Sequence, residues 1–286
     1  MKEISFFAKL PFLNIHPAVP WTGQRRGKLM RISSLIRCQQ IAEHLGAKIN
    51  PESGYIDDIC VYVKPDYMFN DHPGFNADNV YIDVVDDRRS IYVLKDHPRF
   101  IGIACSQKDQ VFLSGHLKNE IILIPQHHCN FERATREIGE LRNIGMVGSV
   151  SLMPLFPKTL KAELARRNIQ LFNFNSMYSR QDVVNFYNTI DLQVIWRPYT
   201  TWLSNPLKII NAASFGIPTI ALQEPGFQEV EGFYFPVRDE NGFVEALDRL
   251  IVDHILRADS SLKCIVLAEN YHIDRIGKLY EQLCTI

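Results

Sequence analysis

The residues NPLKIINAASFGIPTIALQEPGFQEVE, numbers 205–231, carry the clearest structural signal in the chain. They predict a helix over 206–215, because proline suits the first helical turn and Gly216 can end a helix in the left-handed conformation. Residues 217–222 then form a short apolar run, typical of a parallel strand covered on both faces. Such a helix–strand unit can hold phosphate or ribose at a helix start. The stretch therefore predicts a nucleotide site late in the chain.

Composition sets the class of protein. The chain has 286 residues, 46% of them hydrophobic, and a formal net charge of −1. This length predicts two domains of about 150 residues each, and the near-neutral charge argues against a general nucleic-acid or membrane-surface binder. Its six cysteines form no C-x-x-C pair, which predicts reduced thiols in a cytoplasmic protein. Lys9, Pro11 and His16 interrupt the apolar N-terminal run, so we expect no signal peptide and no transmembrane segment.

Strand and helix patterns alternate, which predicts an α/β fold. In the first half we expect strands at 4–8, 59–63, 80–85, 101–106 and 121–124, with a long loop at 9–27 and a helix at 28–45 that Gly46 ends. In the second half we expect strands at 144–150, 170–174 and 192–196, and helices at 133–141, 158–167, 180–188, 242–255 and 264–284. The prediction is two Rossmann-like domains facing a central cleft, residues 1–141 and 142–263, with a C-terminal helix at 264–286 that packs back on the first domain.

The second half resembles a known family. NPLKIINAASFGIPTIALQEPGFQEVEG, followed by FYFPVRDENGFVEALDRLI, looks like the donor-binding half of a GT-B glycosyltransferase of the retaining GT4 type. The resemblance implies a glycosyltransferase that moves a sugar from a nucleotide-diphosphate sugar to an acceptor hydroxyl, with retention and without a metal or other cofactor. Residues 142–263 would bind the nucleotide sugar, and residues 1–141 would bind the acceptor. That acceptor could be a glycan, a lipid-linked sugar, a protein or a modified nucleic acid.

The chain departs from the pattern of that family at two positions. Leu203 and Asn211 stand where the family carries two glutamates eight residues apart. Ser204, Asn205 and Lys208 resemble a shortened Ser-x-Pro-x-Lys loop found in relatives that lack the first glutamate. Asn211 can still donate to and accept from ribose hydroxyls through its amide.

Several residues suit the donor. Lys208, in the first turn of its helix, can add charge at the positive helix end, or it can be a solvated surface lysine. Arg197 follows a predicted strand and can pair with phosphate, or with a local carboxylate. Glu229, beyond Gly226, can hold sugar or ribose hydroxyls, or simply begin a helix. Lys158 is a candidate for the diphosphate, because no arginine follows the strand at 144–150.

The first half offers two further candidates, a basic loop and an aspartate. In GQRRGKLMR, Gly23, Arg25 and Arg26 form a basic loop at a helix start that can approach the donor phosphates or face water. Asp86, at a strand end, can orient or deprotonate the acceptor hydroxyl, or Asp86 or Asp87 can cap a helix.

His127 and His128 are expected to line a hinge or cleft at the end of the first half. The His-His-Cys triplet predicts no metal site, because adjacent residues rarely bind one ion. Two rival functions stay open: a non-catalytic nucleotide-sugar-binding protein, and a GT-B-fold nucleotide-sugar epimerase. A glycosyltransferase acting on modified DNA bases is a third variant. A Rossmann dehydrogenase is disfavoured, because no G-x-G-x-x-G follows an early strand.

Overall fold

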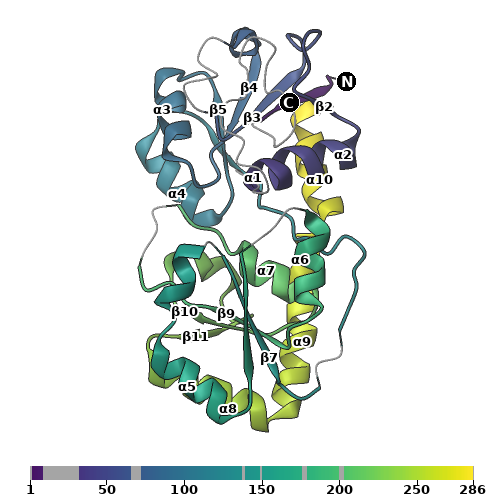
Figure 1. Cartoon of the computed structure of the whole chain (residues 1–286). Coiled ribbons are helices and arrows are strands. Elements are labelled where there is room, and N and C mark those ends of the chain that lie inside the picture. Colours follow the sequence, from purple (N-terminus) through teal and green to yellow (C-terminus); the bar gives the residue numbers. More distant parts are fainter. Residues whose placement is uncertain are drawn as a thin grey trace. The chain divides into compact units, whose positions relative to one another are not determined.

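A computed structural model describes residues 2–8, 32–65, 72–136, 139–148, 150–175, 179–199 and 203–285. The chain divides into two compact units. Unit 1 comprises Met1–His127, Trp202–Asn205 and Ile273–Ile286, and unit 2 comprises His128–Thr201 and Pro206–His272. Each unit has its own parallel sheet (Figure 1). These two parallel-sheet units confirm the predicted α/β fold class.

The sheet of unit 1 has six parallel strands in the order β2-β1-β3-β4-β5-β6. They are β1 (Ile4–Phe7), β2 (Lys48–Ile49), β3 (Ile59–Val63), β4 (Asn79–Asp83), β5 (Ile101–Ala104) and β6 (Ile121–Leu123). The five predicted strands of the first half are confirmed within a few residues at each end. Strand β2 was not predicted, because two residues carry no readable period.

Unit 1 also contains helices from both ends of the chain. They are α1 (Ile32–Ser34), the π-helical turn η1 (Leu35–Gln40), α2 (Ile41–Leu45), the 3-10 turn η3 (Pro73–Asn76), α3 (Arg88–Asp96), α4 (Gln107–His116), α10 (Ile273–Gln282) and the 3-10 turn η6 (Leu283–Thr285). Gly46 ends α2 in the left-handed conformation, at φ 65°, as predicted.

The sheet of unit 2 has five parallel strands in the order β11-β10-β9-β7-β8. They are β7 (Asn143–Val147), β8 (Gln170–Phe174), β9 (Leu192–Ile195), β10 (Thr219–Leu222) and β11 (Phe235–Val237). Strand β7 pairs with both β8 and β9, so the direction of the winding reverses between β7 and β9. Open α/β sheets bind ligands at the carboxyl ends of the strands beside such a switch.

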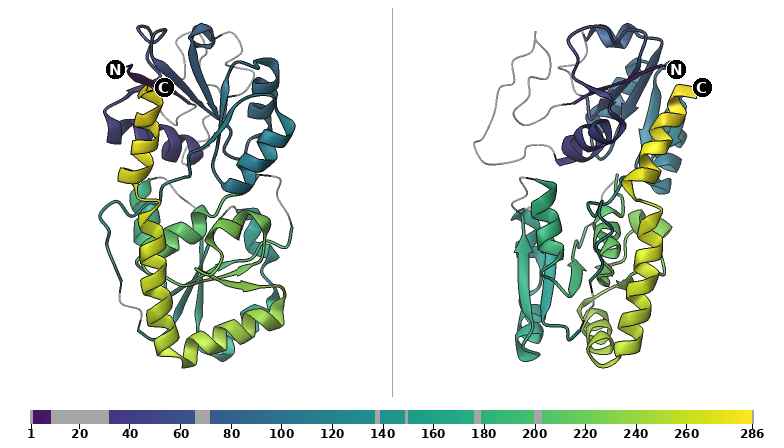
Figure 2. Two further views of the ribbon diagram at one scale, coloured as in Figure 1. Left: turned by 180° about the vertical axis from the view of Figure 1, so that it is seen from behind. Right: turned by 90° about the vertical axis from the view of Figure 1, so that its right-hand side faces the viewer.

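Helices cover both faces of this sheet. They are the 3-10 turn η4 (Val150–Leu155), α5 (Lys158–Arg166), α6 (Arg180–Tyr187), α7 (Leu207–Ser214), the 3-10 turn η5 (Pro225–Val230), α8 (Glu240–Val252) and α9 (His254–Glu269). Helix α9 packs along α7 (Figure 2). Gly216 follows α7 at φ 72°, which bears out its predicted role as the helix stop.

Two predicted helices are wrong. The described residues of 133–141 form no helix, because Arg133 has a φ of 52° and the backbone N–H groups of Arg142 and Asn143 donate to the Asp191 carboxylate. The helix expected at 264–284 is two helices, α9 and α10. Between them, the Tyr271 carbonyl accepts from His128 N–H instead of continuing the helical ladder.

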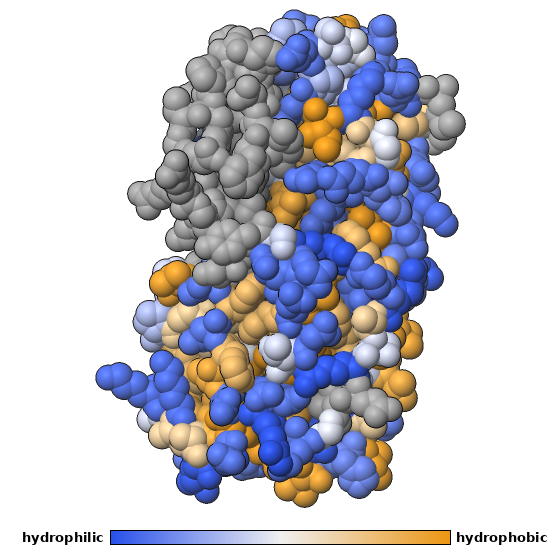
Figure 3. All heavy atoms as spheres, turned by 45° about the vertical axis from the view of Figure 1, so that its right-hand side comes forward, coloured by the Kyte–Doolittle hydropathy of each residue, from blue (hydrophilic) through white to orange (hydrophobic). Residues whose placement is uncertain are grey.

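Among the described residues, no helix combines the length and the apolar character needed to cross a membrane. On the face drawn in Figure 3, hydrophobic residues lie scattered among hydrophilic ones.

Candidate functional site

The carboxyl edge of the unit 2 sheet gathers the residues that suit an anionic ligand. Strands β7, β9 and β10 run parallel, so the residues that follow them lie at one edge of the sheet. Gly148 follows β7, Arg197 comes shortly after β9, and Glu224 comes shortly after β10. Because β7 and β9 flank the topological switch, this edge is where the fold favours a ligand.

Lys208 extends from the first turn of α7 to the end of β7. Its Nζ lies 3.2 Å from the position that a Cβ on Gly148 would occupy, and Leu152 Cδ1 lies 2.9 Å from the same position. Glycine at 148 therefore leaves the backbone beside the ammonium uncovered by a side chain. A backbone that can be approached closely, next to a cation, is the arrangement that phosphate-binding loops use.

Arg197 and Glu224 form an ion pair across the ends of β9 and β10. Arg197 Nε donates to Glu224 Oε2 at 3.0 Å, and the second guanidinium nitrogen bonds the other carboxylate oxygen. The side chain of Arg197 is 21% exposed and that of Glu224 8%. The sequence allowed either phosphate or a local carboxylate as the partner of Arg197. That carboxylate is Glu224. Part of the Arg197 side chain is therefore still open to solvent.

Both partners of that ion pair affect the pKa of the Lys208 ammonium. Burial and then the positive charge of Arg197 lower the pKa of Lys208 to about 8, while Glu224 opposes this fall. The site therefore carries two cations and one carboxylate when Lys208 is protonated. A diphosphate placed there would supply the missing negative charge.

Asn211 lies one turn beyond Lys208 on α7. Its Oδ1 accepts from the Cys129 N–H at 2.9 Å. Gly226 and Glu229 lie in η5, Gly226 buried and Glu229 partly buried. Lys158 is exposed at the first residue of α5.

The residues just before α7 belong to unit 1. Leu203 packs in the hydrophobic core of that unit. Ser106 Oγ donates to the Ser204 carbonyl at 3.0 Å, and the Ser204 N–H donates to Asp109 Oδ1 at 3.2 Å. Asn205 is the last residue of this segment. The position of the first family glutamate is therefore occupied by a core residue of unit 1.

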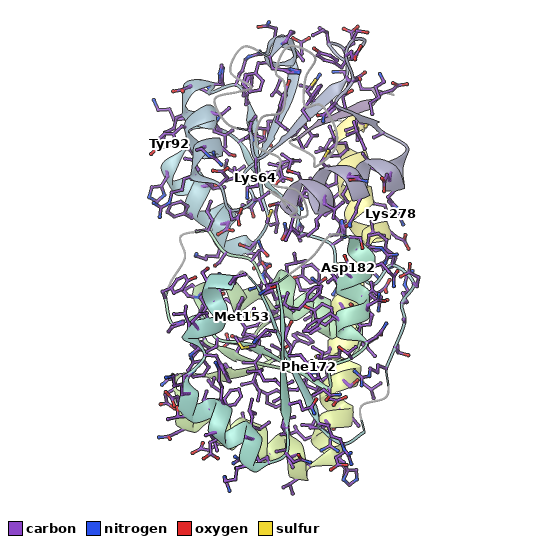
Figure 4. All side chains as sticks on the ribbon, viewed as in Figure 1. Lys64, Tyr92, Met153, Phe172, Asp182 and Lys278 are labelled. Atoms are coloured by element: carbon purple, nitrogen blue, oxygen red, sulfur yellow. The ribbon has the colours of Figure 1, made fainter. Side chains whose placement is uncertain are left out.

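In unit 1, three aspartates at the end of β4 have separate environments. Asp83 is buried and accepts from Arg37 Nε at 2.7 Å. Asp87 caps α3 by accepting from the Arg89 N–H. Of the two aspartates considered as the helix cap, Asp87 is therefore the one that caps it. Asp86 is 56% exposed and pairs with Lys64, which lies just beyond β3 (Figure 4). Of the three carboxylates, Asp86 is the one that an incoming hydroxyl can reach.

The chain passes from unit 1 to unit 2 between His127 and His128. In unit 1, His127 Nε2 lies 2.9 Å from the Ile36 carbonyl. In unit 2, the His128 N–H donates to Tyr271, and its ring lies 5.3 Å from that of His272. The described part of the chain holds no cluster of residues suited to a metal ion. Gly23, Arg25 and Arg26 lie outside the described residues.

Sequence reasoning missed four residues that the structure brings to these edges: Gly148, Glu224, Lys64 and Asp109. Each of the first three stands just after a strand of a parallel sheet, and that position was a usable signal. Asp109 carried no such signal, because its contact with Ser204 spans 95 residues of sequence.

The chain matches no protein-family profile and no curated protein by sequence. It is similar in structure to HepE of Anabaena, solved with UDP, with a TM-score of 0.63, 12% identity, and coverage of 99% of this chain and 100% of HepE. It is also similar to a point mutant of Staphylococcus aureus TarM, solved with fondaparinux, alpha-GlcNAc-glycerol and UDP, with a TM-score of 0.57 and 13% identity. That match covers 78% of this chain and 55% of TarM, so the chain spans about half of its length.

A third similar structure is the Glycosylation Associate Protein (Gap123) complex of Streptococcus agalactiae. Its TM-score is 0.55 at 13% identity, with coverage of 90% of this chain and 58% of that chain. At these identities the likeness shows the fold, which is the GT-B fold of glycosyltransferases.

Proposed function

We propose that the chain is a glycosyltransferase that binds a nucleotide-diphosphate sugar at the carboxyl edge of unit 2. The observation that carries this proposal is the position of Lys208 beside Gly148, with Arg197 on the adjacent strand end. Two cations and an open backbone at a topological switch suit a diphosphate. The proposal includes the GT4-like subclass, retention of configuration and independence from metal ions.

In the proposed chemistry, the anomeric bond breaks and negative charge grows on the leaving diphosphate. Lys208 and Arg197 stabilise that charge, which is the role that a metal ion plays in other transferases. Asn211, Ser204, Asn205, Gly226 and Glu229 are proposed to serve the nucleotide and sugar, and Lys158 the diphosphate. HepE and TarM have both been solved with UDP, which supports UDP as the first ligand to test.

On the acceptor side, we assign Asp86 to the acceptor hydroxyl. Its exposure and its pairing with Lys64 support this role, because an exposed carboxylate at a strand end can accept a proton from a hydroxyl or orient it. The acceptor class stays open among a glycan, a lipid-linked sugar, a protein and a modified nucleic acid.

The second candidate function is a nucleotide-sugar-binding protein without catalysis. One observation favours it: the positions of both family glutamates hold uncharged residues with structural contacts. Leu203 packs in a core, and Asn211 accepts from Cys129. Binding and turnover therefore need separate measurements.

The test is calorimetry of the full-length chain with UDP, followed by release of glucose from UDP-glucose. We expect UDP to bind the wild type and Lys208→Ala to weaken binding by about 10- to 100-fold, since a hydrogen bond to a charged group contributes roughly 1.5–3 kcal/mol. Lys263→Ala, which removes an exposed lysine of α9, is the matched control.

Unchanged affinity in Lys208→Ala would remove the phosphate assignment. If UDP-, GDP-, ADP- and TDP-sugars all fail to bind the wild type, the glycosyltransferase proposal falls. Tight binding with no turnover on any acceptor would favour the non-catalytic candidate.

A further inference from the structure

Beneath the first turn of α7 lies a set of buried polar side chains that the proposed chemistry does not use. Gln193 stands in the middle of β9, Thr219 begins β10, and Tyr187 ends α6. All three are buried, with exposed fractions of 0%, 1% and 0% respectively. Polar groups inside a sheet core destabilise the fold unless each finds a partner, so their partners indicate what this group does.

The Gln193 amide is fully satisfied, and one of its partners is the backbone of Lys208. Its Nε2 donates to the Lys208 carbonyl at 2.9 Å and to Thr219 Oγ1 at 3.0 Å. Its Oε1 accepts from the Tyr187 hydroxyl at 2.8 Å. The orientation of the amide is set, because a carbonyl can only accept and must face the Nε2 hydrogens.

The same network reaches Asn211. The Tyr187 hydroxyl gives its proton to Gln193 and also lies 3.5 Å from the Lys208 carbonyl, so its oxygen is left able to accept from the neighbouring Asn211 side chain. Asn211 Oδ1 in turn accepts from the Cys129 N–H. A glutamate at position 211 could not donate to Tyr187 when ionised. An amide at this position thus fits the network.

We propose that Gln193 is a positioning residue: with its amide oriented by Tyr187 and Thr219, it holds the first turn of α7 on the sheet, so that Lys208 and Asn211 keep their places at the ligand edge. This inference rests on the proposed function. A hydrophobic residue would fill the same space in a strand core but would leave the Lys208 carbonyl without this donor. The hydrogen bonds of the amide are directional, so they fix the position of α7 more closely than apolar packing alone can.

The first readout needs no ligand. An amine-reactive reagent modifies Lys208 in the free full-length protein. Mass spectrometry follows the rate of this modification as a function of pH. We expect Gln193→Met, which keeps the volume and removes the donors, to move the midpoint for Lys208 upward toward that of an ordinary lysine. The ammonium would then no longer be held in its partly buried place beside Gly148.

The second readout is the dissociation constant of UDP. We expect Gln193→Met to raise it about tenfold, as the misplacement of one charged phosphate contact would. Tyr187→Phe, a milder change, should shift both readouts in the same direction. It decides the question alone if Gln193→Met fails to fold.

The control is Asn119→Leu, which removes another buried amide, one that donates to the His97 and Phe100 carbonyls in unit 1. It should lower the melting temperature while leaving Lys208 reactivity and UDP affinity as in the wild type. The inference is overturned if the folded Gln193 and Tyr187 variants behave as this control does. Failure of the wild type to bind UDP would overturn the proposed function instead, and the reactivity of Lys208 would still report on Gln193.

Discussion

Lys208 Nζ lies 3.2 Å from the position that a Cβ on Gly148 would occupy. The contact joins the end of β7 to the first turn of α7. A methyl group at 148 would push the ammonium away from the backbone that a phosphate would approach. Leu152 Cδ1, at 2.9 Å from the same position, would also have to move.

Gly148→Ala should therefore weaken UDP binding about tenfold, because the charged contact to phosphate is displaced. Its stability should stay within about 1 kcal/mol of the wild type, since both crowded atoms are ends of flexible side chains. Calorimetry with UDP and urea unfolding measure the two effects. Gly115→Ala, where a Cβ meets nothing within 4 Å, is the control and should bind UDP normally.

The pH dependence of UDP binding should follow Lys208. Burial and then Arg197 lower its pKa to about 8, so the ammonium loses its proton above that pH. Between about pH 7 and about pH 9.5 we expect affinity to fall, by at most about tenfold per pH unit. Lys208→Arg keeps a permanent cation and should flatten this profile. The same decline in both proteins would show that another group titrates.

The titration of Lys208 affects folding stability in the opposite direction: stability should rise with pH where UDP affinity falls. The folded pKa of Lys208 lies below the ordinary value of 10.5, so folding disfavours the charged form. Its unfavourable contribution is complete below about pH 8 and disappears as the pH rises toward 10.5. Lys208→Met should therefore be stabilised relative to the wild type at neutral pH, and this gain should shrink in alkaline solution.

Local patterns in the sequence predicted much of the fold. Gly216 at φ 72° and the short strand β10 follow from a helix stop and an apolar run. Such signals lie within a few residues of the feature that they predict, so one sequence suffices to read them.

Long-range contacts were not readable in this way. Nothing near Leu203 indicates that it packs in the core of unit 1, and nothing near Tyr271 indicates that its carbonyl accepts from His128. The pairing of Arg197 with Glu224 was foreseen only as one alternative, because the two residues are 27 positions apart. The sequence therefore predicted Arg197 and Lys208 as site cations, but it did not identify Glu224 as the carboxylate that pairs with Arg197.

Asp109 should make unit 1 more stable when it is protonated. Burial raises its pKa to about 6, while the Ser204 N–H and Lys108 oppose that rise. The ordinary value is 3.8, so its favourable contribution is complete below about pH 3.8 and is lost as the pH rises through about 6.

Asp109→Asn removes this titration. Relative to the wild type, its free energy of unfolding should be higher at pH 7.5 than at pH 4 by up to about 3 kcal/mol. Urea unfolding of both proteins at the two pH values gives this difference. A difference that does not change with pH would contradict the assignment to Asp109. Asp96→Asn, at an exposed residue of α3, serves as the control.

The charge balance at the ends of β9 and β10 should control the affinity for UDP. Glu224 neutralises Arg197, so Glu224→Gln should leave two cations facing the diphosphate and raise the affinity for UDP several-fold at low salt. It should also lower the pKa of Lys208 further, because Glu224 raises it in the wild type. The decline of affinity with pH should then begin at lower pH.

Arg197→Met should have the opposite effects on UDP affinity and on the pKa of Lys208. It leaves the buried Glu224 carboxylate without its partner, beside the diphosphate, so the affinity for UDP should fall by about 100-fold, as the loss of roughly 3 kcal/mol predicts. The pKa of Lys208 should rise, because the cation that lowers it is gone. In the double variant the two charges leave together, so affinity should recover part of the loss. If the Arg197 and Glu224 variants change UDP affinity in the same direction, the pair does not act on the ligand through charge.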